Sequence, residues 1–221
     1  KINGLSIISH VVKNAENANI GEVYVAAEDQ EIVDDIHNNG GQAILTSKNH
    51  KTGTDRIYEA LKKLDKKDAE LVINLQGDEP LMKSDDIKNL NHKMIMSQSK
   101  IGTLASNFLN KDLYENQNVV KVKTSESLQV SNFPEAINFM RNSKHSDENI
   151  YHHLGIYCYE VEALRKFISF NQSKNELENN LEQLRALDND ININVALANK
   201  SPIGIDTKED YLAIKKIMKY K

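Results

Sequence analysis

The fold class follows from one segment, Glu70-Leu-Val-Ile-Asn-Leu-Gln-Gly-Asp-Glu-Pro-Leu81. Its apolar part, Leu71 to Leu75, is too short for a helix with a face of its own and is typical of a strand buried on both sides in a parallel sheet. Gly77 ends the strand, and two carboxylates follow at once. Ligands of open α/β sheets gather beyond the carboxyl ends of the central strands, so these residues indicate a binding site. Taken alone, Gly-Asp-Glu-Pro is equally ordinary turn chemistry, which stays open as the alternative.

Strands and helices alternate on both sides of this segment up to about residue 98. Such alternation predicts right-handed βαβ crossovers and an α/β fold, with a Rossmann-like, mostly parallel sheet and helices on both faces. The expected strands are 22–27 and 42–46, and the expected helices are 6–18, 29–38, one capped by Thr54, and one from Ser84 that buries Ile87, Leu90, Met94 and Ile95.

After Gly102 the pattern changes to short strand-like segments, which we expect at 103–108, 119–123, 128–133 and 151–159. The polar stretch 138–149 is expected to be a mobile loop. We interpret 103–159 as a β-rich insertion or arm of a single domain that spans residues 1–221. The predicted fold is completed by helices at 161–168 and 177–187, a strand at 191–198 and a closing helix capped by Asp206-Thr207.

The composition limits the classes of partner. The 28 basic and 32 acidic residues give a net charge of -4, so we expect no general attraction to nucleic acid or to an anionic membrane. No apolar run approaches the roughly 20 residues that a membrane span needs. The single cysteine, Cys158, lies among apolar and aromatic residues, which predicts a core side chain and a reducing compartment, the cytoplasm.

A second candidate site is the turn His50-Lys-Thr-Gly-Thr-Asp-Arg56, which joins a predicted strand to a predicted helix. Small residues and the backbone N–H groups of a helix start make such a turn suitable for an anion or a phosphate. A plain capped helix start is the alternative. Arg56 favours the ligand role, because acidic residues are preferred in the first turn of a helix.

A third candidate is the segment 151–159, whose alternation places His153, Gly155, Tyr157 and Tyr159 on one face of a strand. The two adjacent histidines point to opposite sides, which argues against a shared zinc ion. The polar and aromatic face suits a polyhydroxylated substrate, and a solvated sheet face is the alternative.

Two acidic residues indicate a candidate metal site only when they are considered together. Asp206, at the start of the last helix, is by itself an ordinary cap. Asp78 and Asp206 each follow a strand-like segment, and their carboxylates are the oxygen ligands that Mg²⁺ takes when it is shared with substrate phosphates. The block Leu181-Glu-Gln-Leu-Arg185 adds a charged side chain and an amide, and alone it indicates little.

In this order the motifs resemble one family, the 3-deoxy-manno-octulosonate cytidylyltransferases, which make the CMP-activated octulosonate of bacterial lipopolysaccharide. The combination of Gln-Gly-Asp-Glu-Pro with His-Leu-Gly-Ile-Tyr is specific to this family among sugar nucleotidyltransferases. The resemblance covers nearly the whole chain and rests on Ile2-Asn-Gly4, His50-x-x-Gly53-Thr54-x-Arg56, Asn74-Leu-Gln76-Gly-Asp78-Glu-Pro80, His153-Leu-Gly-Ile-Tyr157, Leu181-Glu-Gln-Leu-Arg185 and Gly204-Ile-Asp206-Thr207-x-Glu209-Asp210.

The resemblance implies a reaction, a metal and a homodimer formed through the arm. The anomeric hydroxyl of octulosonate would attack the α-phosphorus of CTP, and pyrophosphate would leave. It implies catalytic Asp78 and Asp206 on Mg²⁺, nucleotide contacts from Thr54, Arg56 and Gln76, the last at ribose or sugar, and sugar contacts from His153, Tyr157, Glu182 and Gln183.

The chain also departs from the family pattern. The family begins with a strand and an Ala-Arg-x-x-Ser-x-Arg-Leu-Pro-Gly-Lys loop around the triphosphate, which we expect upstream of Lys1. Asn132-Phe-Pro-Glu-Ala-Ile-Asn-Phe139 replaces Tyr-Phe-Ser-Arg-x-x-Ile-Pro, and the stretch before Leu181 is slightly shorter. Two alternatives therefore stay open: a cytidylyltransferase for another sugar acid, such as a sialic acid, and a non-catalytic nucleotide-sugar-binding relative.

Overall fold

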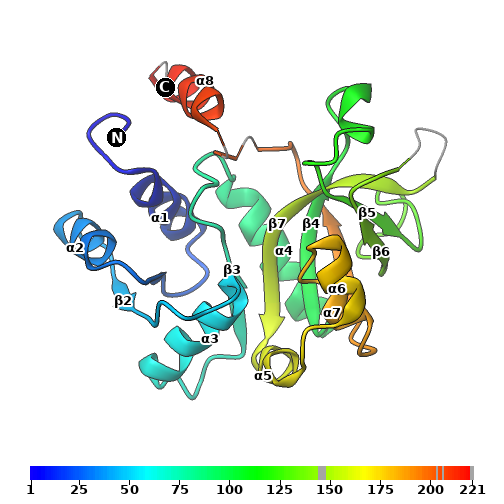
Figure 1. Cartoon of the computed structure of the whole chain (residues 1–221), viewed down its shortest axis with the longest axis horizontal. Coiled ribbons are helices and arrows are strands. Elements are labelled where there is room, and N and C mark those ends of the chain that lie inside the picture. Colours follow the sequence, from blue (N-terminus) through cyan, green and yellow to red (C-terminus); the bar gives the residue numbers. More distant parts are fainter. Residues whose placement is uncertain (144–147, 203, 206, 220–221) are drawn as a thin grey trace. The chain divides into compact units, whose positions relative to one another are not determined.

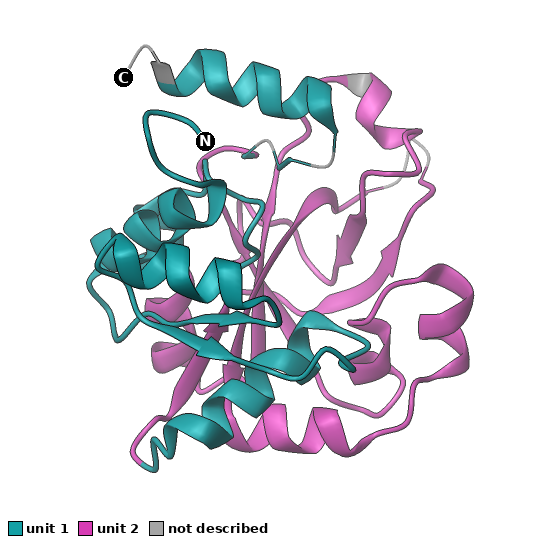
Figure 2. Cartoon of the chain, turned by 60° about the vertical axis from the view of Figure 1, so that its left-hand side comes forward, with its two compact units in different colours: residues 1–67, 75–88, 202–221 teal, residues 68–74, 89–201 magenta. Residues whose placement is uncertain are grey.

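The computed structural model describes residues 1–143, 148–202, 204–205 and 207–219. The chain divides into two compact units (Figure 2). Unit 1 comprises residues 1–67, 75–88 and 202–221, and unit 2 comprises residues 68–74 and 89–201. The interpretation as a single domain with an arm at 103–159 stays a prediction.

Unit 1 carries the alternating part of the predicted fold (Figure 1). Its two strands pair in parallel, with Val25 opposite Ala43. Apolar stripes of two helices pack on them and form a core with Val12, Val33 and Ile36. Its elements are α1 (Ile7–Ala18), β1 (Val25–Ala27), α2 (Gln30–Asn38), β2 (Ala43–Leu45), α3 (Gly53–Leu64) and α8 (Lys208–Lys219).

The helix ends in unit 1 lie close to the predicted positions, with one correction. Gly40 follows α2 with a φ of +82°, a conformation that glycine adopts at little cost. The cap of α3 is Thr52 rather than Thr54: the Thr52 hydroxyl accepts from the Asp55 N–H at 3.2 Å and donates to the Asp55 carboxylate at 3.0 Å. Because Thr52 and Asp55 form these two hydrogen bonds, the helix begins two residues earlier than predicted. Thr54 therefore lies inside the first turn, where it is buried.

The cap of α8 is partly confirmed. The Thr207 hydroxyl accepts from the Asp210 N–H at 3.1 Å, and the Asp210 carboxylate accepts from the Thr207 N–H at 2.9 Å. These reciprocal bonds satisfy two N–H groups at the start of the helix. Asp206, the other half of the predicted cap, lies outside the described residues.

Unit 2 is built on a six-stranded sheet around the long strand β7 (Ile150–Glu160). One edge of β7 pairs antiparallel with β4 (Ile101–Ser106), and its other edge pairs antiparallel with β3 (Leu71–Asn74) at one end and β5 (Lys121–Thr124) at the other. β8 (Ile193–Leu197) runs parallel to β4, and β6 (Ala136–Met140) runs antiparallel to β5. The sheet is accompanied by residues 89–97 of α4 (Ser84–Ser97), whose first five residues belong to unit 1. The other helices of unit 2 are the short helix η1 (Lys111–Tyr114), α5 (Val161–Ser169), α6 (Lys174–Asn179) and α7 (Leu184–Leu187).

The predicted α/β fold class is confirmed, with parallel ladders at β1–β2 and β4–β8. The ladder that the structure shows for β3 is antiparallel, where the sequence predicted a strand of a parallel sheet. Cys158 is fully buried, and burial raises the pKa of its thiol to about 12, so the core interpretation is confirmed. Ile95 was predicted to be buried and is 57% exposed, whereas Ile87, Leu90 and Met94 of the same helix are buried.

Two predicted strand and loop boundaries in unit 2 are wrong. Residues 128–133 form turns, and the strand is β6, which begins after Pro134. Proline has no N–H to donate to a ladder, which explains why pairing starts beyond it. The predicted loop 138–149 therefore begins inside β6, where Phe139 is 1% exposed in the core.

The predicted helix 177–187 is two short helices. α6 ends at Asn179 and is followed by Asn180, which has a φ of +50°, and α7 begins at Leu184. A residue with left-handed backbone stops the helical hydrogen-bond pattern, so the helix ends there. Glu182 and Gln183 thus lie on the connection and at the N-cap of α7 instead of along one amphipathic helix.

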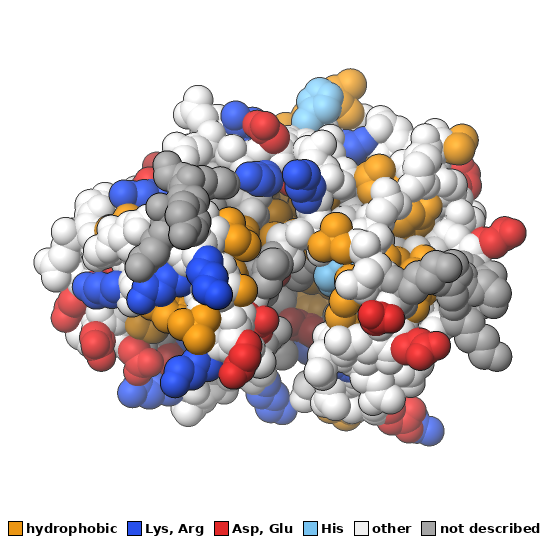
Figure 3. Space-filling view, turned by 90° about the horizontal axis from the view of Figure 1, so that it is seen from above, with side chains coloured by type: hydrophobic (Ala, Val, Ile, Leu, Met, Phe, Trp, Pro, Cys, Tyr) orange, Lys and Arg blue, Asp and Glu red, His pale blue; other side chains and the backbone are white. Residues whose placement is uncertain are grey.

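The surface agrees with the near balance of charges in the sequence. On the face seen in Figure 3, basic and acidic side chains are interspersed. Within the described ranges, no helix is long and apolar enough to cross a membrane.

Candidate active site

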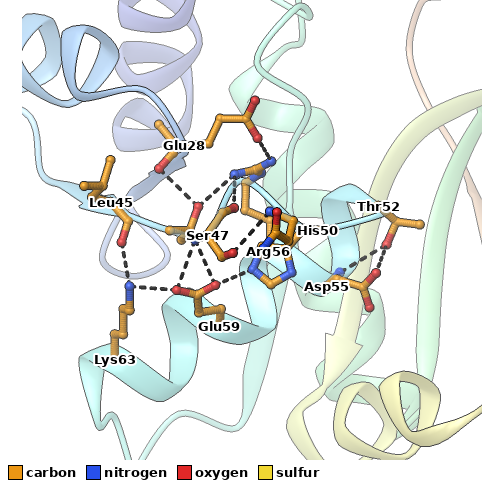
Figure 4. Close-up of polar contacts among 12 residues, drawn as sticks. Glu28, Leu45, Ser47, His50, Thr52, Asp55, Arg56, Glu59 and Lys63 are labelled. Carbon is orange, nitrogen blue, oxygen red and sulfur yellow. Dashed lines mark hydrogen bonds and ion pairs between the residues drawn. The ribbon is translucent and has the colours of Figure 1, made fainter.

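Arg56 lies at the carboxyl ends of the two strands of unit 1 (Figure 4). Its guanidinium donates to the Thr46 hydroxyl at 2.9 Å and to the Ser47 carbonyl at 3.2 Å, both just after β2, and it pairs with the carboxylate of Glu28, just after β1. The predicted anion turn therefore lies at the edge of the parallel pair where α/β folds bind ligands. The sequence-based reasoning missed Glu28, although an acidic residue directly after a strand was the available signal.

The same turn is fixed by Glu59 of α3. Its carboxylate accepts from Lys63 Nζ in an ion pair of 2.7 Å, from His50 Nε2, and from the Ser47 N–H at 3.0 Å. The bond from Lys63, followed by the bond from His50, lowers the pKa of Glu59 to about 2. His50 therefore links the turn to helix α3 through Glu59. This structural role explains why a histidine is part of the motif, and it requires no contact with a ligand.

Gln76 reaches the start of α3. A Cβ atom added to Gly53 would lie 3.8 Å from Nε2 of Gln76, so the amide is next to the first turn of that helix. Gly77 has a packing role that the sequence did not indicate, because a Cβ atom there would meet Cδ1 of Ile8 at 2.8 Å. Gln76 and the Thr54–Arg56 turn are thus brought together within unit 1.

The segment that carries Asp78 lies beside the segment that leads to the last helix. The Ile205 N–H donates to the Asp78 carbonyl at 3.0 Å, and a Cβ atom on Gly204 would lie 3.6 Å from Oε1 of Glu79. Asp78 is exposed. Asp206, which follows Ile205 in the chain, is outside the described residues, and the described ones contain no cluster of three or more His, Cys, Asp or Glu suited to a metal.

In unit 2, the predicted polar and aromatic face of β7 is confirmed. The ring centroids of His153 and Tyr157 are 5.4 Å apart, and those of Tyr157 and Tyr159 are 5.9 Å apart. Thr103 Oγ1 donates its one proton to the Ile156 carbonyl at 2.7 Å, so His153 Nε2 is the donor in its 3.0 Å bond to the same oxygen. The imidazole is therefore held in a single tautomer.

The neighbouring histidine has a different environment, as the alternation predicts. His152 Nδ1 shares a 2.8 Å hydrogen bond with the Ser201 hydroxyl. Burial, followed by the charge of Lys121, lowers the pKa of His152 to about 4. The two adjacent imidazoles have separate partners, in agreement with the argument against a shared metal ion.

Burial dominates the electrostatics of the aromatic face. It lowers the pKa of His153 to about 3, with a smaller contribution from His152. Burial also raises the pKa of Tyr157 well above its usual value, followed by the effects of Tyr159 and Glu182. Among the described residues, the buried Tyr157 hydroxyl has no hydrogen-bond partner. A buried hydroxyl without a partner costs free energy unless a ligand pairs with it.

We expect the stability of the protein to fall as the pH drops from about 6.5 to about 5. The unfolded chain binds protons on His152 and His153 in this range, whereas the folded chain keeps both imidazoles neutral, so each contributes up to ~1.4 kcal/mol per pH unit. Urea midpoints at several pH values measure the slope. His153→Gln should reduce it, and an unchanged slope would show that His153 is not buried as a neutral group.

The remaining predicted sugar residues lie next to a buried ion pair. Glu182 and Gln183 are half-buried. Arg185 is 3% exposed and forms a two-point pair with Glu176, and its Nη2 lies 3.9 Å from Oε1 of Glu182. The sequence-based reasoning missed Glu176, whose signal was the capping-box pattern Ser173-x-x-Glu176.

These residues divide between the two units. Unit 1 holds the candidates for nucleotide and metal, Thr54, Arg56, Gln76 and Asp78. Unit 2 holds the candidates for the sugar, His153, Tyr157, Glu182 and Gln183.

An α/β fold in which an arginine-bearing turn and a carboxylate follow the ends of strands suits a protein that binds an anionic ligand such as a nucleotide. The chain belongs to the cytidylyltransferase family, whose model, described as "Cytidylyltransferase", matches residues 1–193. Its relatives include 3-deoxy-manno-octulosonate cytidylyltransferases. The one from Thermodesulfovibrio yellowstonii is 41% identical over 215 residues, which are 92% of this chain and 84% of the relative. The one from Bartonella tribocorum is 36% identical over 220 residues, which are 99% and 90% of the two chains.

Solved structures agree with this assignment. The structure of a CMP:2-keto-3-deoxy-manno-octonic acid synthetase complexed with CTP matches with a TM-score of 0.88 and 29% identity, over 100% of this chain and 90% of that chain. A 4-diphosphocytidyl-2C-methyl-D-erythritol synthase from Anaerococcus prevotii matches with a TM-score of 0.64 and 16% identity, over 99% and 91% of the chains. The second likeness supports the fold alone.

Proposed function

We propose that the protein transfers the cytidylyl group of CTP to 3-deoxy-manno-octulosonate, giving the CMP-sugar and pyrophosphate. The observation that carries the proposal is the likeness of the whole chain to a synthetase that was solved with CTP. The names of the relatives support the same sugar acid. The proposed setting is lipopolysaccharide biosynthesis in the cytoplasm.

The proposed reaction depends on the positioning of the substrates by the protein more than on covalent chemistry. The anomeric oxygen of the sugar acid forms a bond to the α-phosphorus of CTP, and the bond from that phosphorus to the oxygen that bridges to the β-phosphate breaks. Both reactants are anionic, so the protein has to orient them and offset their charge.

Asp78 and Asp206 are proposed to hold a Mg²⁺ ion that is shared with the substrates. The support is the exposed Asp78 and the hydrogen bond from Ile205, which holds the segment leading to Asp206 beside it. Two carboxylates with substrate oxygens form the kind of donor set that Mg²⁺ takes. When bound, the ion would offset charge on the phosphate and on the attacking oxygen.

Thr54, Arg56 and Gln76 are proposed for the nucleotide. The start of the 12-residue helix α3 offers backbone N–H groups and a positive dipole end to an anion. Arg56 is anchored by Glu28 and Thr46, so its guanidinium is held in place beside this helix start. Gln76, next to Gly53, is placed to contact ribose or sugar.

His153, Tyr157, Glu182 and Gln183 are proposed for the sugar acid. The support is their combination of donors and acceptors around a buried aromatic face, which suits hydroxyl groups. His153 is a neutral imidazole in a fixed tautomer, so it acts as a hydrogen-bonding group and not as a cation.

A homodimer is proposed through the β-rich region. The support is two large apolar side chains that this region exposes, Val130 at 86% and Ile137 at 57%. Exposed apolar groups of this size favour burial against a partner surface. We expect no nucleic-acid or membrane partner.

Tyr157→Phe should raise the KM for the sugar acid about 5- to 150-fold, as expected for one lost hydrogen bond of about 1–3 kcal/mol, and should leave the KM for CTP nearly unchanged. Steady-state kinetics with each substrate varied in turn measures both values. Tyr151→Phe is the matched control, because its hydroxyl bonds Gln129 at 2.9 Å, and both KM values should be kept. Equal effects of Tyr157→Phe on the two substrates would remove Tyr157 from the sugar site.

The experiment that tests the proposal is a comparison of acceptors. Purified protein with CTP and Mg²⁺ should give a higher kcat/KM with octulosonate than with a nine-carbon sialic acid, measured by pyrophosphate release. Preference for the sialic acid would support the sister activity. Binding of CTP by calorimetry without release of pyrophosphate from any acceptor would support the non-catalytic relative.

A further inference from the structure

Arg185 is a buried cation that two carboxylates share unequally. Its Nε donates to Oε2 of Glu176 at 2.8 Å, and its Nη2 donates to Oε1 of Glu176 at 2.5 Å. The same Nη2 lies 3.9 Å from Oε1 of Glu182, which is too long for a hydrogen bond. Glu176 therefore forms the two-point hydrogen bond with the guanidinium, and Glu182 lies beyond hydrogen-bond distance of its Nη2.

Several contacts hold the pair in this arrangement. The Ser173 hydroxyl accepts from the Glu176 N–H at 3.1 Å, and the Glu176 carboxylate accepts from the Ser173 N–H at 3.1 Å, in a capping box at the start of α6. Gln172 donates to the same carboxylate at 3.2 Å. The guanidinium of Arg185 lies over the ring of Phe167, 4.6 Å from its centroid. The position of Arg185 is thus fixed from two sides.

We propose that Glu176 is a positioning residue for the sugar acid: by occupying Arg185, it keeps the carboxylate of Glu182 as an acceptor for substrate hydroxyl groups. The inference rests on the proposed function, which assigns Glu182 to the sugar. A shift of about 1 Å would bring Arg185 and Glu182 to the ~2.9 Å of a charge-assisted hydrogen bond. A carboxylate held in that way gives up acceptor sites that hydroxyl groups of the substrate need.

The test is Glu176→Gln, which keeps the shape of the side chain and removes its charge. The KM for octulosonate should rise at least ~10-fold, the effect of about 1.4 kcal/mol, while kcat and the KM for CTP stay within ~2-fold. In a crystal structure of the variant, Arg185 Nη2 and Glu182 Oε1 should approach to hydrogen-bond distance. Glu176→Asp, which keeps the charge on a shorter side chain, should give an intermediate KM.

Ser173→Ala is the matched control. It removes the cap of the same helix and should lower the melting temperature. The KM for octulosonate should stay within ~2-fold, because the two bonds from Arg185 still hold the Glu176 carboxylate. An unchanged KM in Glu176→Gln, or an equal rise in Ser173→Ala, would overturn the proposal. If only Glu176→Asp folds, an unchanged KM in that variant overturns it. If the wild-type protein does not use octulosonate, the proposed function fails. The inference about Glu176 is tested separately by the structure of Glu176→Gln. It is overturned if the distance between Arg185 and Glu182 does not shorten in that variant.

Discussion

Asp78→Asn is expected to lower kcat at least ~100-fold and to leave the fold intact, and Asp206→Asn should do the same. An amide has no charge with which to hold Mg²⁺ or to offset the phosphates. The hydrogen bond to Ile205 is made by the backbone carbonyl of Asp78, which the substitution leaves in place. Initial rates of pyrophosphate release measure the loss, and circular dichroism checks the fold.

Asp85→Asn is the matched control for this prediction. The Asp85 side chain is 82% exposed and forms an i,i+3 pair of 3.8 Å with Lys88 on α4. A surface pair of this kind contributes little to stability. Turnover close to the wild-type value is therefore expected. Near-normal activity in Asp78→Asn would remove that carboxylate from the site, and an equal loss in Asp85→Asn would point to a general effect of charge.

Arg185→Met is expected to lower the free energy of unfolding by about 3–5 kcal/mol, because it leaves the buried carboxylate of Glu176 without its cation. The side chains of the pair are only 3% and 4% exposed, so water cannot replace the lost partner. Urea unfolding followed by circular dichroism measures the change. A shift below about 1 kcal/mol would show that the pair behaves as an exposed one.

The double variant Glu176→Met/Arg185→Met separates the free-energy cost of an unpaired buried charge from the net contribution of the ion pair to stability. Replacing both partners of a buried ion pair by apolar groups is often close to neutral, so most of the stability should return. Its KM for octulosonate should stay near the wild-type value, because the variant has no guanidinium to bind Glu182. A raised KM in a stable double variant would contradict the proposed role of the pair.

The sequence predicted unit 1 well because its signals are local. Helical spacing at 6–18 and 29–38, strands at 22–27 and 42–46, and the glycines after α2 each report on a few neighbouring residues. Capping was the weak point: Thr52 and Thr54 are equally good caps by residue type, and Asp55 decided between them.

Unit 2 was harder because its boundaries depend on distant partners. The extent of the strand after Pro134 depends on its pairing with β5. The break after α6 depends on the left-handed backbone of Asn180, which the spacing of apolar residues does not indicate. Glu28 and Glu176 escaped notice for the same reason. Each bonds an arginine on another element, Arg56 for Glu28 and Arg185 for Glu176. The local signal, a position after a strand or a capping box, does not identify that partner.

Transfer of a cytidylyl group to octulosonate is tested by following both products of the reaction. Purified protein is incubated with CTP, octulosonate and Mg²⁺, and the products are identified by mass spectrometry while pyrophosphate is counted. We predict one CMP-octulosonate for each pyrophosphate released, and no release when either substrate is omitted. Release of pyrophosphate without the CMP-sugar, or no release under these conditions, would contradict the account.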